Sequence, residues 1–308
     1  MTITATPETT ADTPTSAAAA AVQSSNAAHT VPTRRISFEE VVATVPKHFA
    51  EHGDLINSHI VAALTSVFPD GEDYFVRSVR RFRDQITDPV LKRQVNGFIG
   101  QESVHGREHR VFNERLDELG YGTKRAERVT RAVLRGRERI TSAKSNLAVT
   151  AALEHFTATL AELLLRDEDF RRSAGHQAVQ DLFVWHALEE AEHKAVAFDV
   201  YRAVGGSERM RIGSMKVIRK GFITAMAFQV TLSVLMDPAT YRRGNLRTSL
   251  RRFKTSPFLR KELREQLRAY DRVGFHPDDI DTDDLVAEWR EKLFGDEGSL
   301  NVLLASAA

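Results

Sequence analysis

The chain has 308 residues, a formal net charge of +1 and no cysteine. Its length allows one large domain or two modest ones, and 42% hydrophobic and 28% charged residues are typical of a globular protein. The near-neutral charge favours no particular partner. The lack of cysteine excludes disulfides, thiolate metal sites, iron–sulfur clusters and cysteine nucleophiles. We predict a cytoplasmic location, with which this composition is consistent.

The N-terminal segment differs in composition from the rest of the chain. Residues 1–34 are rich in Ala, Thr, Ser and Pro, so we predict a disordered tail there. No basic residue precedes the short apolar run Ala17–Val22, so a secretory signal is not expected.

The remainder of the chain reads as one helix after another, with residues such as Phe98 and Phe112 at helical spacing. Pro69 and Pro89 are predicted in first helical turns, and Gly205 at a helix end. No alternating strand pattern, GxGxxG, P-loop or GxSxG occurs, so the fold class is all-α and the usual nucleotide and serine-hydrolase sites are excluded. The predicted helices are 37–50, 54–67, 71–87, 88–119, 124–140, 143–171, 175–204, 208–236, 239–252, 256–272 and 282–294.

The most apolar stretch is Gly221–Met236. It is shorter than the roughly 20 apolar residues of a spanning helix, and Gln229 interrupts it, so we expect a buried or surface-seated helix. Membrane-surface contact is therefore not favoured. We assign four large side chains here to the core in preference to a substrate channel: Phe222, Met226, Phe228 and Leu232.

Charge is distributed unevenly along the chain. Residues 124–144 and 242–268 are basic, and residues 278–297 are acidic. We interpret these segments as solvated helix faces in preference to a nucleic-acid or anionic-lipid patch, because no RNA- or DNA-reading motif accompanies them. No nucleic-acid partner is expected, and a homodimer is compatible with the sequence.

The stretch WHALEEAEHKAVAFDVY, which begins at Trp185, carries the most informative pattern. His186, Glu190 and His193 lie at offsets of four and seven, so they project onto one stripe of a helix. Glu189 and Glu192 are rotated away from that stripe, and we expect Glu189 to support a ligand and Glu192 to face solvent. Two imidazoles and one carboxylate are thereby presented to a single point.

A second segment, GQESVHGREH, repeats part of this pattern. It places Glu102, His105 and His109 on one helix face. Both segments contain Glu-x-x-His, and bundles that house two metal ions use this motif on two helices with one further Glu from each of the other two. We therefore predict Glu102, His105, Glu190 and His193 as ligands, and treat His109 as an additional candidate that could equally orient a ligand.

The chemistry of two neighbouring cations explains this ligand set. Bridging carboxylates offset the repulsion between the cations, and each ion also takes a terminal imidazole. Iron and manganese suit such mixed nitrogen and oxygen sites. We predict two divalent ions, iron in the first place, with manganese as an alternative and zinc if the reaction is hydrolytic.

The metal site described above needs one further glutamate from each of two other helices. Glu154 lies in the apolar stretch AALEHFTATLAELLL, where an unpaired carboxylate would be costly, and Glu162 is the fallback. For the first helix we choose Glu72, although an acidic residue favouring a helix N-terminus explains it equally well.

The remaining histidines show no ligand spacing. His155 points away from Glu154 and is expected to support a ligand or pack in the core. His276 precedes a proline and acidic residues, which is typical of a turn and a helix N-cap. Surface or packing roles are expected for the rest: His48, His52, His59 and His176.

Taken together, QESVHGREH, LEHFTA, WHALEEAEHKAVAFDVY and GFHPDDIDTDDL resemble a bacterial family labelled predicted metal-dependent hydrolase, over roughly residues 35–295. The ordered ligands also resemble the ferritin-like di-iron carboxylate proteins. This resemblance implies a ferritin-like four-helix bundle with additional N- and C-terminal helices. HxxxExxH resembles the di-iron arylamine N-oxygenases, and this similarity implies that His186 is a third imidazole ligand.

From these observations we divide the chain into a bundle at 35–205, a C-terminal helical elaboration at 206–295 that packs on it, and a tail at 296–308. The leading functional expectation is a di-iron oxidase or oxygenase that activates O₂ to oxidise a small apolar substrate, with an external electron donor. The alternatives are a hydrolase with dimetal-activated water, as the family label states, and a non-catalytic iron-binding protein. No catalytic residue is predicted beyond the metal ligands.

Overall fold

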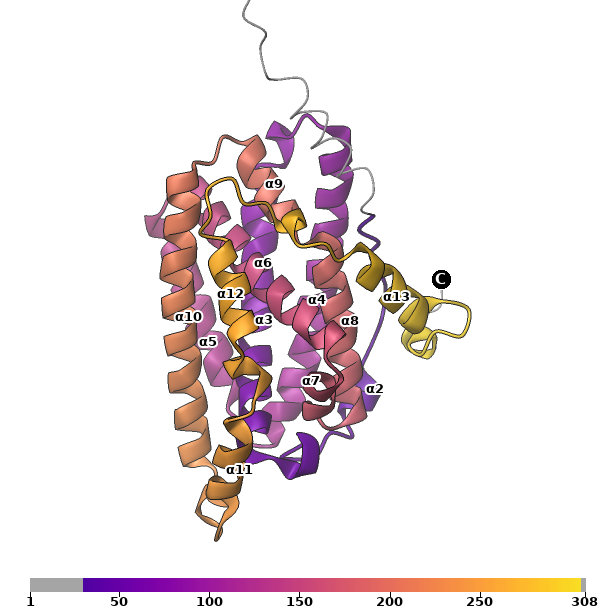
Figure 1. The fold of residues 1–308 in the computed structure, drawn as a ribbon, viewed down its shortest axis with the longest axis vertical. Helices are drawn as coiled ribbons and strands as arrows, with labels where there is room; N and C mark the ends of the chain where they lie inside the picture. The colour runs from indigo at the N-terminus through magenta and orange to yellow at the C-terminus, as the bar shows by residue number, and fades with distance from the viewer. Residues whose placement is uncertain (1–29, 306–308) are drawn as a thin grey trace, which may run out of the picture.

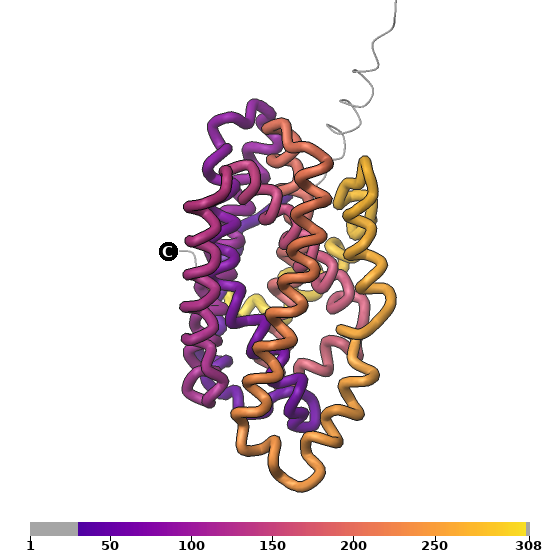
Figure 2. The backbone as a smooth tube through the Cα atoms, turned by 90° about the vertical axis from the view of Figure 1, so that its left-hand side faces the viewer, coloured from indigo at the N-terminus to yellow at the C-terminus, as the bar shows by residue number. Residues whose placement is uncertain are grey.

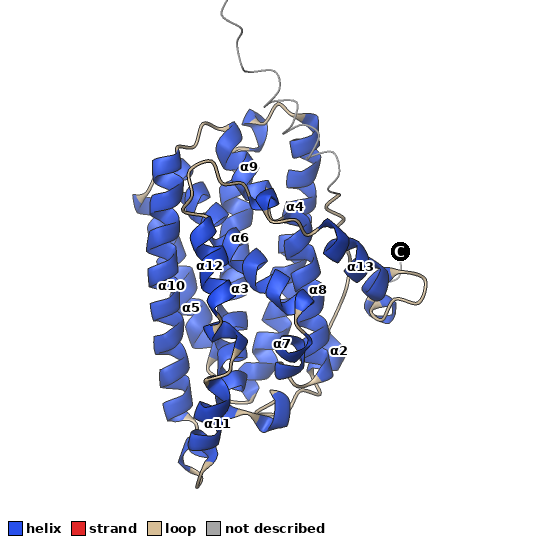
Figure 3. Cartoon of the chain, viewed as in Figure 1, coloured by secondary structure: helices blue, strands red, loops and turns tan. Residues whose placement is uncertain are grey.

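The computed structural model describes residues 30–305, so most of the tail predicted at 1–34 lies outside the described residues. Within that range the chain is helical throughout, with loops between the helices and one isolated antiparallel bridge between Ile36 and Leu304 (Figure 3). The all-α prediction is confirmed. The α-helices are α2 Glu39–Val42, α3 Leu55–Arg80, α4 Pro89–Glu118, α5 Thr123–Ile140, α6 Ala143–Arg166, α7 Glu168–Ser173, α8 Gln177–His193, α9 Val196–Ala203, α10 Glu208–Met236, α11 Asn245–Phe253, α12 Lys261–Ala269 and α13 Asp283–Phe294. The 3₁₀ turns are η1 Glu51–Gly53, η2 Arg83–Gln85, η3 Pro238–Tyr241, η4 Pro257–Leu259, η5 Pro277–Asp279 and η6 Asn301–Leu303.

Four long helices, α3, α4, α6 and α8, form a central bundle (Figure 1). Helix α5 packs on α3 and α4, α10 packs on α3 and α6, and α12 and α13 cover α6 and α8. Residues 296–305 return to the start of the described chain, where Ala305 N–H donates to the Arg35 carbonyl at 2.8 Å. Polar side chains fix several helix starts: Asp54 caps α3, Asp88 precedes Pro89 and caps α4, and Ser142 caps α6.

The structure joins two predicted helices, 54–67 and 71–87, into the single helix α3 with Pro69 in its interior. A proline there removes the hydrogen bond to the carbonyl four residues earlier. That carbonyl belongs to Thr65, and it accepts instead from the Asn113 side-chain amide at 3.0 Å. The helix continues because α4 supplies the missing donor, which local sequence rules do not reveal.

Five other predicted helices are shorter or divided. The segment 239–252 is split into η3 and α11, and the segment 256–272 into η4 and α12. The segment 37–50 contains only α2, because Pro46 interrupts it and His48 adopts a positive φ of 56°. The segment 143–171 is divided at Asp167, whose side chain caps α7, and the segment 175–204 is divided between His193 and Val196.

Helix α10 runs along the outside of the bundle, and much of its apolar surface is uncovered. Phe228 is 70% exposed and Leu232 is 40% exposed, so the prediction that they are core residues is wrong. Phe222 is half-buried against Phe156. Two described helices, α6 and α10, are long and apolar enough to cross a membrane, but α6 is mostly inside the bundle. In α10 only 6% of the most apolar window is buried.

Candidate metal centre

The predicted ligands meet between the four bundle helices. Helix α3 contributes Glu72, α4 contributes Glu102 and His105, and α6 contributes Glu154. Helix α8 contributes a further three, which are His186, Glu190 and His193. All seven side chains are buried. The structure therefore brings together in space every side chain that we selected from the sequence.

One half of the site surrounds the His193 imidazole. Its Nε2 atom lies 3.2 Å from Glu102 Oε1, 3.5 Å from Glu154 Oε2 and 3.6 Å from Glu190 Oε2. The other ring nitrogen, Nδ1, is 2.8 Å from Gln101 Oε1, which fixes the ring and its tautomer. With Nδ1–H donating to Gln101, Nε2 is the atom that faces the three carboxylates, and its lone pair becomes available to a metal ion once its proton is lost.

The other half of the site surrounds His105 and His186. His105 Nδ1 lies 3.8 Å from Glu102 Oε2, while its Nε2 is 3.0 Å from Glu189 Oε2. His186 Nε2 lies 2.8 Å from Glu190 Oε1 and 3.9 Å from Glu72 Oε1. Glu102 and Glu190 thus take part in both halves, which is the position of bridging carboxylates.

Close approach of α3 and α4 depends on a glycine. A side chain beginning at Gly106 would place its first carbon 3.3 Å from Glu72 Oε2. That contact is tighter than ordinary packing, so the glycine leaves room for the carboxylate next to α4.

Many buried polar atoms in this centre have no hydrogen-bond partner among the described residues. They are both carboxylate oxygens of Glu72, Glu102 and Glu154, together with His105 Nδ1 and His193 Nε2. An unsatisfied buried polar group costs about 1–3 kcal/mol, and more when it is charged. Eight such atoms close together would destabilise the folded protein unless cations occupy the space between them. The residues present therefore fit two divalent ions.

Charge balance supports the same conclusion. Burial, assisted by Glu102, raises the pKa values of Glu72 and Glu154 well above the usual range, which favours their protonated forms. Burial opposes protonation of His105, but Glu102 and Glu189 outweigh it and raise its pKa to about 10. Likewise, Glu102 and Glu154 outweigh burial and raise the pKa of His193. Divalent cations between these side chains would take the place of the protons that the raised pKa values favour.

Metal binding should therefore release protons. Ligation needs deprotonated carboxylates and neutral imidazoles, whereas the pKa values of Glu72, Glu154, His105 and His193 are all raised, which favours the protonated forms. We expect apparent affinity for Zn²⁺ to rise by roughly ten-fold or more per pH unit between pH 6 and 7. Calorimetric titration in buffers of different ionisation enthalpy measures the protons released. Affinity independent of pH, with no proton release, would contradict this charge assignment.

His109, the additional candidate ligand, lies behind His186. Its Nε2 is 2.6 Å from His186 Nδ1, and its Nδ1 is 2.7 Å from Thr65 Oγ1. Burial, with His186 close by, holds the pKa of His109 well below its usual range, so the ring is neutral. Both of its nitrogens have partners, and this position orients His186.

Charged residues behind the ligands connect the centre to the chain's N-terminal segment. Glu189 accepts from Arg34 at 2.9 Å while facing His105, and Glu192 accepts from Gln101, Arg34 and Arg290. Burial disfavours the charge of Glu192, but Arg34 outweighs it and lowers its pKa. The expectation that Glu192 faces solvent is wrong, because Arg34 and Arg290 cover it. Arg34 thereby touches the residues behind both His105 and His193.

Two further residues escaped sequence reasoning. Thr157 Oγ1 lies 2.5 Å from Glu190 Oε2 and points into the centre, and Gln101 holds His193. Gln101 precedes Glu102 directly, but neither its type nor its spacing marks it as a support for a histidine 92 residues later. Arg34 gave no signal because it follows a segment of tail-like composition.

The residues considered as alternatives lie away from the metal centre. Glu162 accepts from Arg166 at 2.8 Å, and His155 Nε2 is bonded to the Gln266 carbonyl at 3.0 Å. His276 caps η5, and not the last helix, while its Nε2 lies 2.8 Å from Asp199 Oδ1.

An apolar pocket leads to the centre. It encloses about 700 Å³, including the part open to solvent, and lies between α3, α6, α7, α8 and η4. Thr157, His186 and Glu190 lie at its inner end. Most of the other lining side chains are apolar: Val61, Leu64, Phe68, Leu160, Ala161, Leu164, Phe170, Ala174, Phe183, Ala187 and Phe258. None of the four α10 side chains considered for a channel lines this pocket.

Comparison with known proteins agrees with a metal centre. No curated protein and no solved structure matches the chain. A family model described as predicted metal-dependent hydrolase matches residues 32–281, which include every residue of the centre and of the network behind it except Arg290. The chain therefore belongs to the family of predicted metal-dependent hydrolases.

Proposed function

We propose that this protein is a dinuclear-metal hydrolase that acts on a small, largely apolar substrate. The observation that carries the proposal is the pocket: its apolar walls end at Glu190 and His186, beside the cluster of buried carboxylates and imidazoles. The family description supports hydrolysis as the first candidate reaction. We retain a cytoplasmic location as part of the proposal.

The protein's own residues have separate tasks in this proposal. Glu72, Glu102, Glu154 and Glu190 with His105, His186 and His193 would hold the ions. Two divalent ions supply a Lewis acid and a lowered pKa for water, and redox-active iron would additionally supply electrons to O₂. The Thr157 hydroxyl is the one neutral side chain bonded to a ligand at the inner end of the pocket, and it orients Glu190. The apolar walls exclude water and select the substrate.

The pocket composition indicates the substrate class. Only Asn57, Thr157 and Ser173 add neutral polar groups to the lining. An apolar pocket with few polar groups favours a ligand with an extended apolar part, while the polar bond to be cleaved lies at the metals. An ester or similar acyl derivative of an apolar acid meets both requirements.

Oxidation is the second candidate, and the ligand set favours it. Three imidazoles and four carboxylates inside a helical bundle suit iron or manganese, and such bundles house di-iron centres. An external electron donor and O₂ would then be required.

The two candidates differ in their need for O₂ and for a redox-active metal. We would test p-nitrophenyl esters of increasing acyl length with the zinc-loaded and iron-loaded protein, in air and under argon. Hydrolysis by the zinc protein without O₂, rising with acyl length, is the expected result. Turnover that requires iron, a reductant and O₂ would overturn hydrolysis in favour of oxidation.

Filling the pocket should separate substrate binding from metal binding. Ala161 lines the pocket but contributes no ligand, so Ala161→Phe is expected to leave metal content unchanged. A bulky ring in a closely packed site removes space for the substrate, and we expect kcat/KM for the longest ester to fall roughly 100-fold or more. A matched substitution on the outside of the bundle, Ala132→Phe in α5, should change neither property. Full activity of Ala161→Phe would place the substrate elsewhere.

A further inference from the structure

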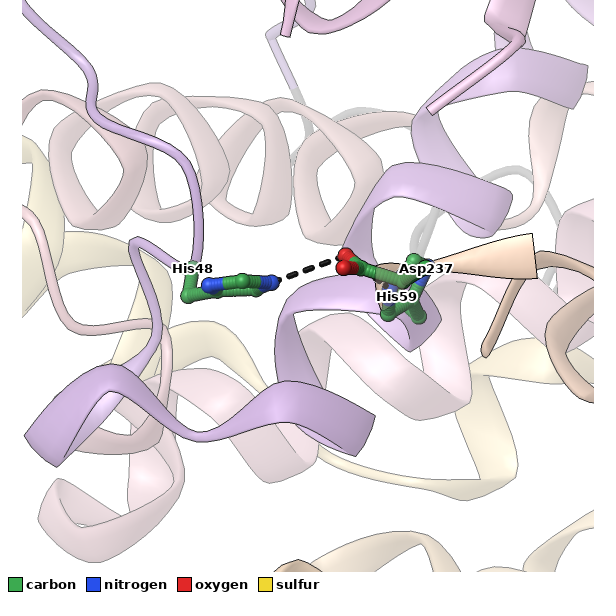
Figure 4. Close-up of side chains that lie close together, drawn as sticks. All are labelled: His48, His59 and Asp237. Atoms are coloured by element: carbon green, nitrogen blue, oxygen red, sulfur yellow. Dashed lines mark hydrogen bonds and ion pairs between the residues drawn. The ribbon is translucent and has the colours of Figure 1, made fainter. Parts of the chain in front are cut away.

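A second cluster of metal-ligand type lies outside the centre described above. His48 from the loop after α2, His59 from α3 and Asp237 at the end of α10 converge on one point (Figure 4). His48 Nε2 lies 2.8 Å and His59 Nε2 lies 3.2 Å from the same oxygen, Asp237 Oδ2. Three segments that are distant in sequence thus each contribute one donor atom.

The second polar atoms of His59 and Asp237 are held by neighbours. His59 Nδ1 lies 2.7 Å from Ser233 Oγ, and Asp237 Oδ1 accepts from the Ala239 backbone N–H at 2.8 Å. Metal-binding histidines commonly use their second nitrogen in this way, because the bond fixes the ring and its tautomer. The partners orient His59 and Asp237 so that Nε2 and Oδ2 face each other.

The backbone at His48 is held in an unfavourable conformation. Its φ is 56°, in the left-handed region that asparagine and glycine adopt more easily than histidine. The Tyr121 hydroxyl accepts from the His48 backbone N–H at 3.0 Å. In this conformation the His48 imidazole reaches Asp237.

Protonation states also suit ligation. Burial is the largest influence on His59 and lowers its pKa to about 4, so the ring is neutral at pH 7. Burial disfavours the Asp237 carboxylate, but the Ala239 N–H and His48 outweigh it and lower its pKa.

We propose that His48, His59 and Asp237 bind a divalent transition-metal ion, with zinc as the best match to two imidazoles and one carboxylate. Zinc takes three such ligands and a water molecule in tetrahedral geometry. The Lys47 ammonium lies 3.3 Å from Asp237 Oδ2 and balances its charge without the ion. Because the Lys47 side chain is partly exposed, it can turn outward when the ion binds. The ion would tie the N-terminal loop to α3 and to the end of α10.

The test exploits a matched pair of histidines. His52 has the same φ of 56° as His48, lies four residues away and faces solvent, outside the cluster. Asparagine tolerates this backbone conformation, so neither His48→Asn nor His52→Asn strains the backbone. We would titrate each protein with Zn²⁺ alone in a Glu102→Gln background, which disables the other centre, and count the bound ions after gel filtration.

The expected result is one tightly bound zinc per chain for His52→Asn and none for His48→Asn. Asp237→Asn, which retains the cap on Ala239, should behave like His48→Asn. Co²⁺ in place of zinc should give the absorption of a tetrahedral site, lost in the same variants. Equal zinc binding by the His48 and His52 variants, or none in the parent protein, would overturn the proposal.

A different observation carries a second inference, which concerns the exposed side of α10. Figure 2 shows α5 and α10 on the same side of the molecule. Phe228 is 70% and Met236 is 69% exposed, and no charged residue occurs between Lys220 and Asp237. The other exposed large apolar side chains of α10, η3 and α11 are Val217, Ile223, Leu232, Leu235, Tyr241 and Leu250.

Cations without ion-pair partners among the described residues border this apolar surface. At one end of the charge-free stretch lie Lys216 and Lys220, and beyond the other end lie four arginines of the η3–α11 region: Arg242, Arg243, Arg247 and Arg251. An exposed apolar helix bordered by Lys and Arg is typical of a segment that lies in a membrane interface. A second copy of the chain would bring the same cations against one another in a symmetric contact.

We infer that this side of α10 binds an anionic lipid surface, with the helix lying in the plane of the interface. The sequence did not favour membrane-surface contact, because the apolar stretch is short and contains Gln229, but the structure leaves Phe228 and Leu232 exposed. Apolar side chains would enter the headgroup region while the bordering cations meet the lipid phosphates.

Sedimentation with vesicles tests this inference. We expect the protein to bind vesicles that contain 30% phosphatidylglycerol but not pure phosphatidylcholine, and Phe228→Asp/Met236→Asp to weaken binding at least roughly ten-fold. Val302→Asp places one such charge at an exposed valine of η6 and should bind normally. Failure to bind any vesicle would overturn lipid binding. A dimer in gel filtration that the α10 variant dissociates would also overturn it, and would show that a second copy of the chain covers this side of α10.

Discussion

Replacing Glu102 by glutamine is expected to remove both metal ions from the central bundle. Glu102 Oε1 lies 3.2 Å from His193 and Glu102 Oε2 lies 3.8 Å from His105, so this carboxylate belongs to both halves of the centre. An amide keeps the shape but offers one oxygen and no charge. Because loss of residues behind the ligands already weakens metal binding 10–100-fold, loss of a bridging ligand should exceed roughly 100-fold.

Elemental analysis of purified protein measures this effect. Glu108 provides a matched control, since it lies on the same helix and is equally buried, yet it accepts from the Phe38 N–H at 2.7 Å and from Arg107. Glu108→Gln should keep its metal even if it loses stability. Full metal content in a folded Glu102→Gln protein would exclude the bridging assignment.

Substitution of Arg34 by alanine is expected to weaken both metal sites from a distance. Arg34 donates to Glu189, which faces His105, and to Glu192, which faces Gln101 and through it His193. Removal leaves two buried carboxylates with fewer donors. Breaking a buried ion pair costs about 3–5 kcal/mol, so we expect Tm to fall by roughly 5–15 °C and metal affinity to fall 10–100-fold.

Two variants distinguish orientation of the ligands from general stability. Arg34→Lys keeps the charge but not the forked geometry, so it should recover stability better than metal affinity. Arg290→Ala removes a contact to Glu192 alone and should have the smaller effect on both. If Arg34→Ala lowers Tm while metal affinity stays unchanged, Arg34 only braces the fold.

The sequence predicted which carboxylates and imidazoles would cluster better than it predicted the helix boundaries. Glu-x-x-His places a carboxylate and an imidazole on one helix face whatever surrounds the helix, so Glu102/His105 and Glu190/His193 could be selected by spacing alone. Glu154 could be selected because a carboxylate in an apolar run needs a partner. Helix ends depend on donors from elsewhere: α3 continues through Pro69 because Asn113, on α4, bonds to the Thr65 carbonyl.

The second histidine cluster illustrates the same limit of local patterns. His48, His59 and Asp237 share no spacing, and they meet only because the N-terminal loop, α3 and the end of α10 pack together. Whether α10 is buried or exposed likewise depends on how distant segments pack. Its composition is that of a core helix, but no described element covers the outward-facing side of Phe228 or Met236.

The sequence by itself therefore determined the helical class and the ligand types, because helical periodicity and ligand chemistry are properties of neighbouring residues. Only the tertiary structure decided that Glu102 faces both His105 and His193 and that Arg34 binds the carboxylate next to His105. It also decided that an apolar pocket ends at Glu190. Those features depend on distances between segments far apart in the chain, and such distances are fixed by packing.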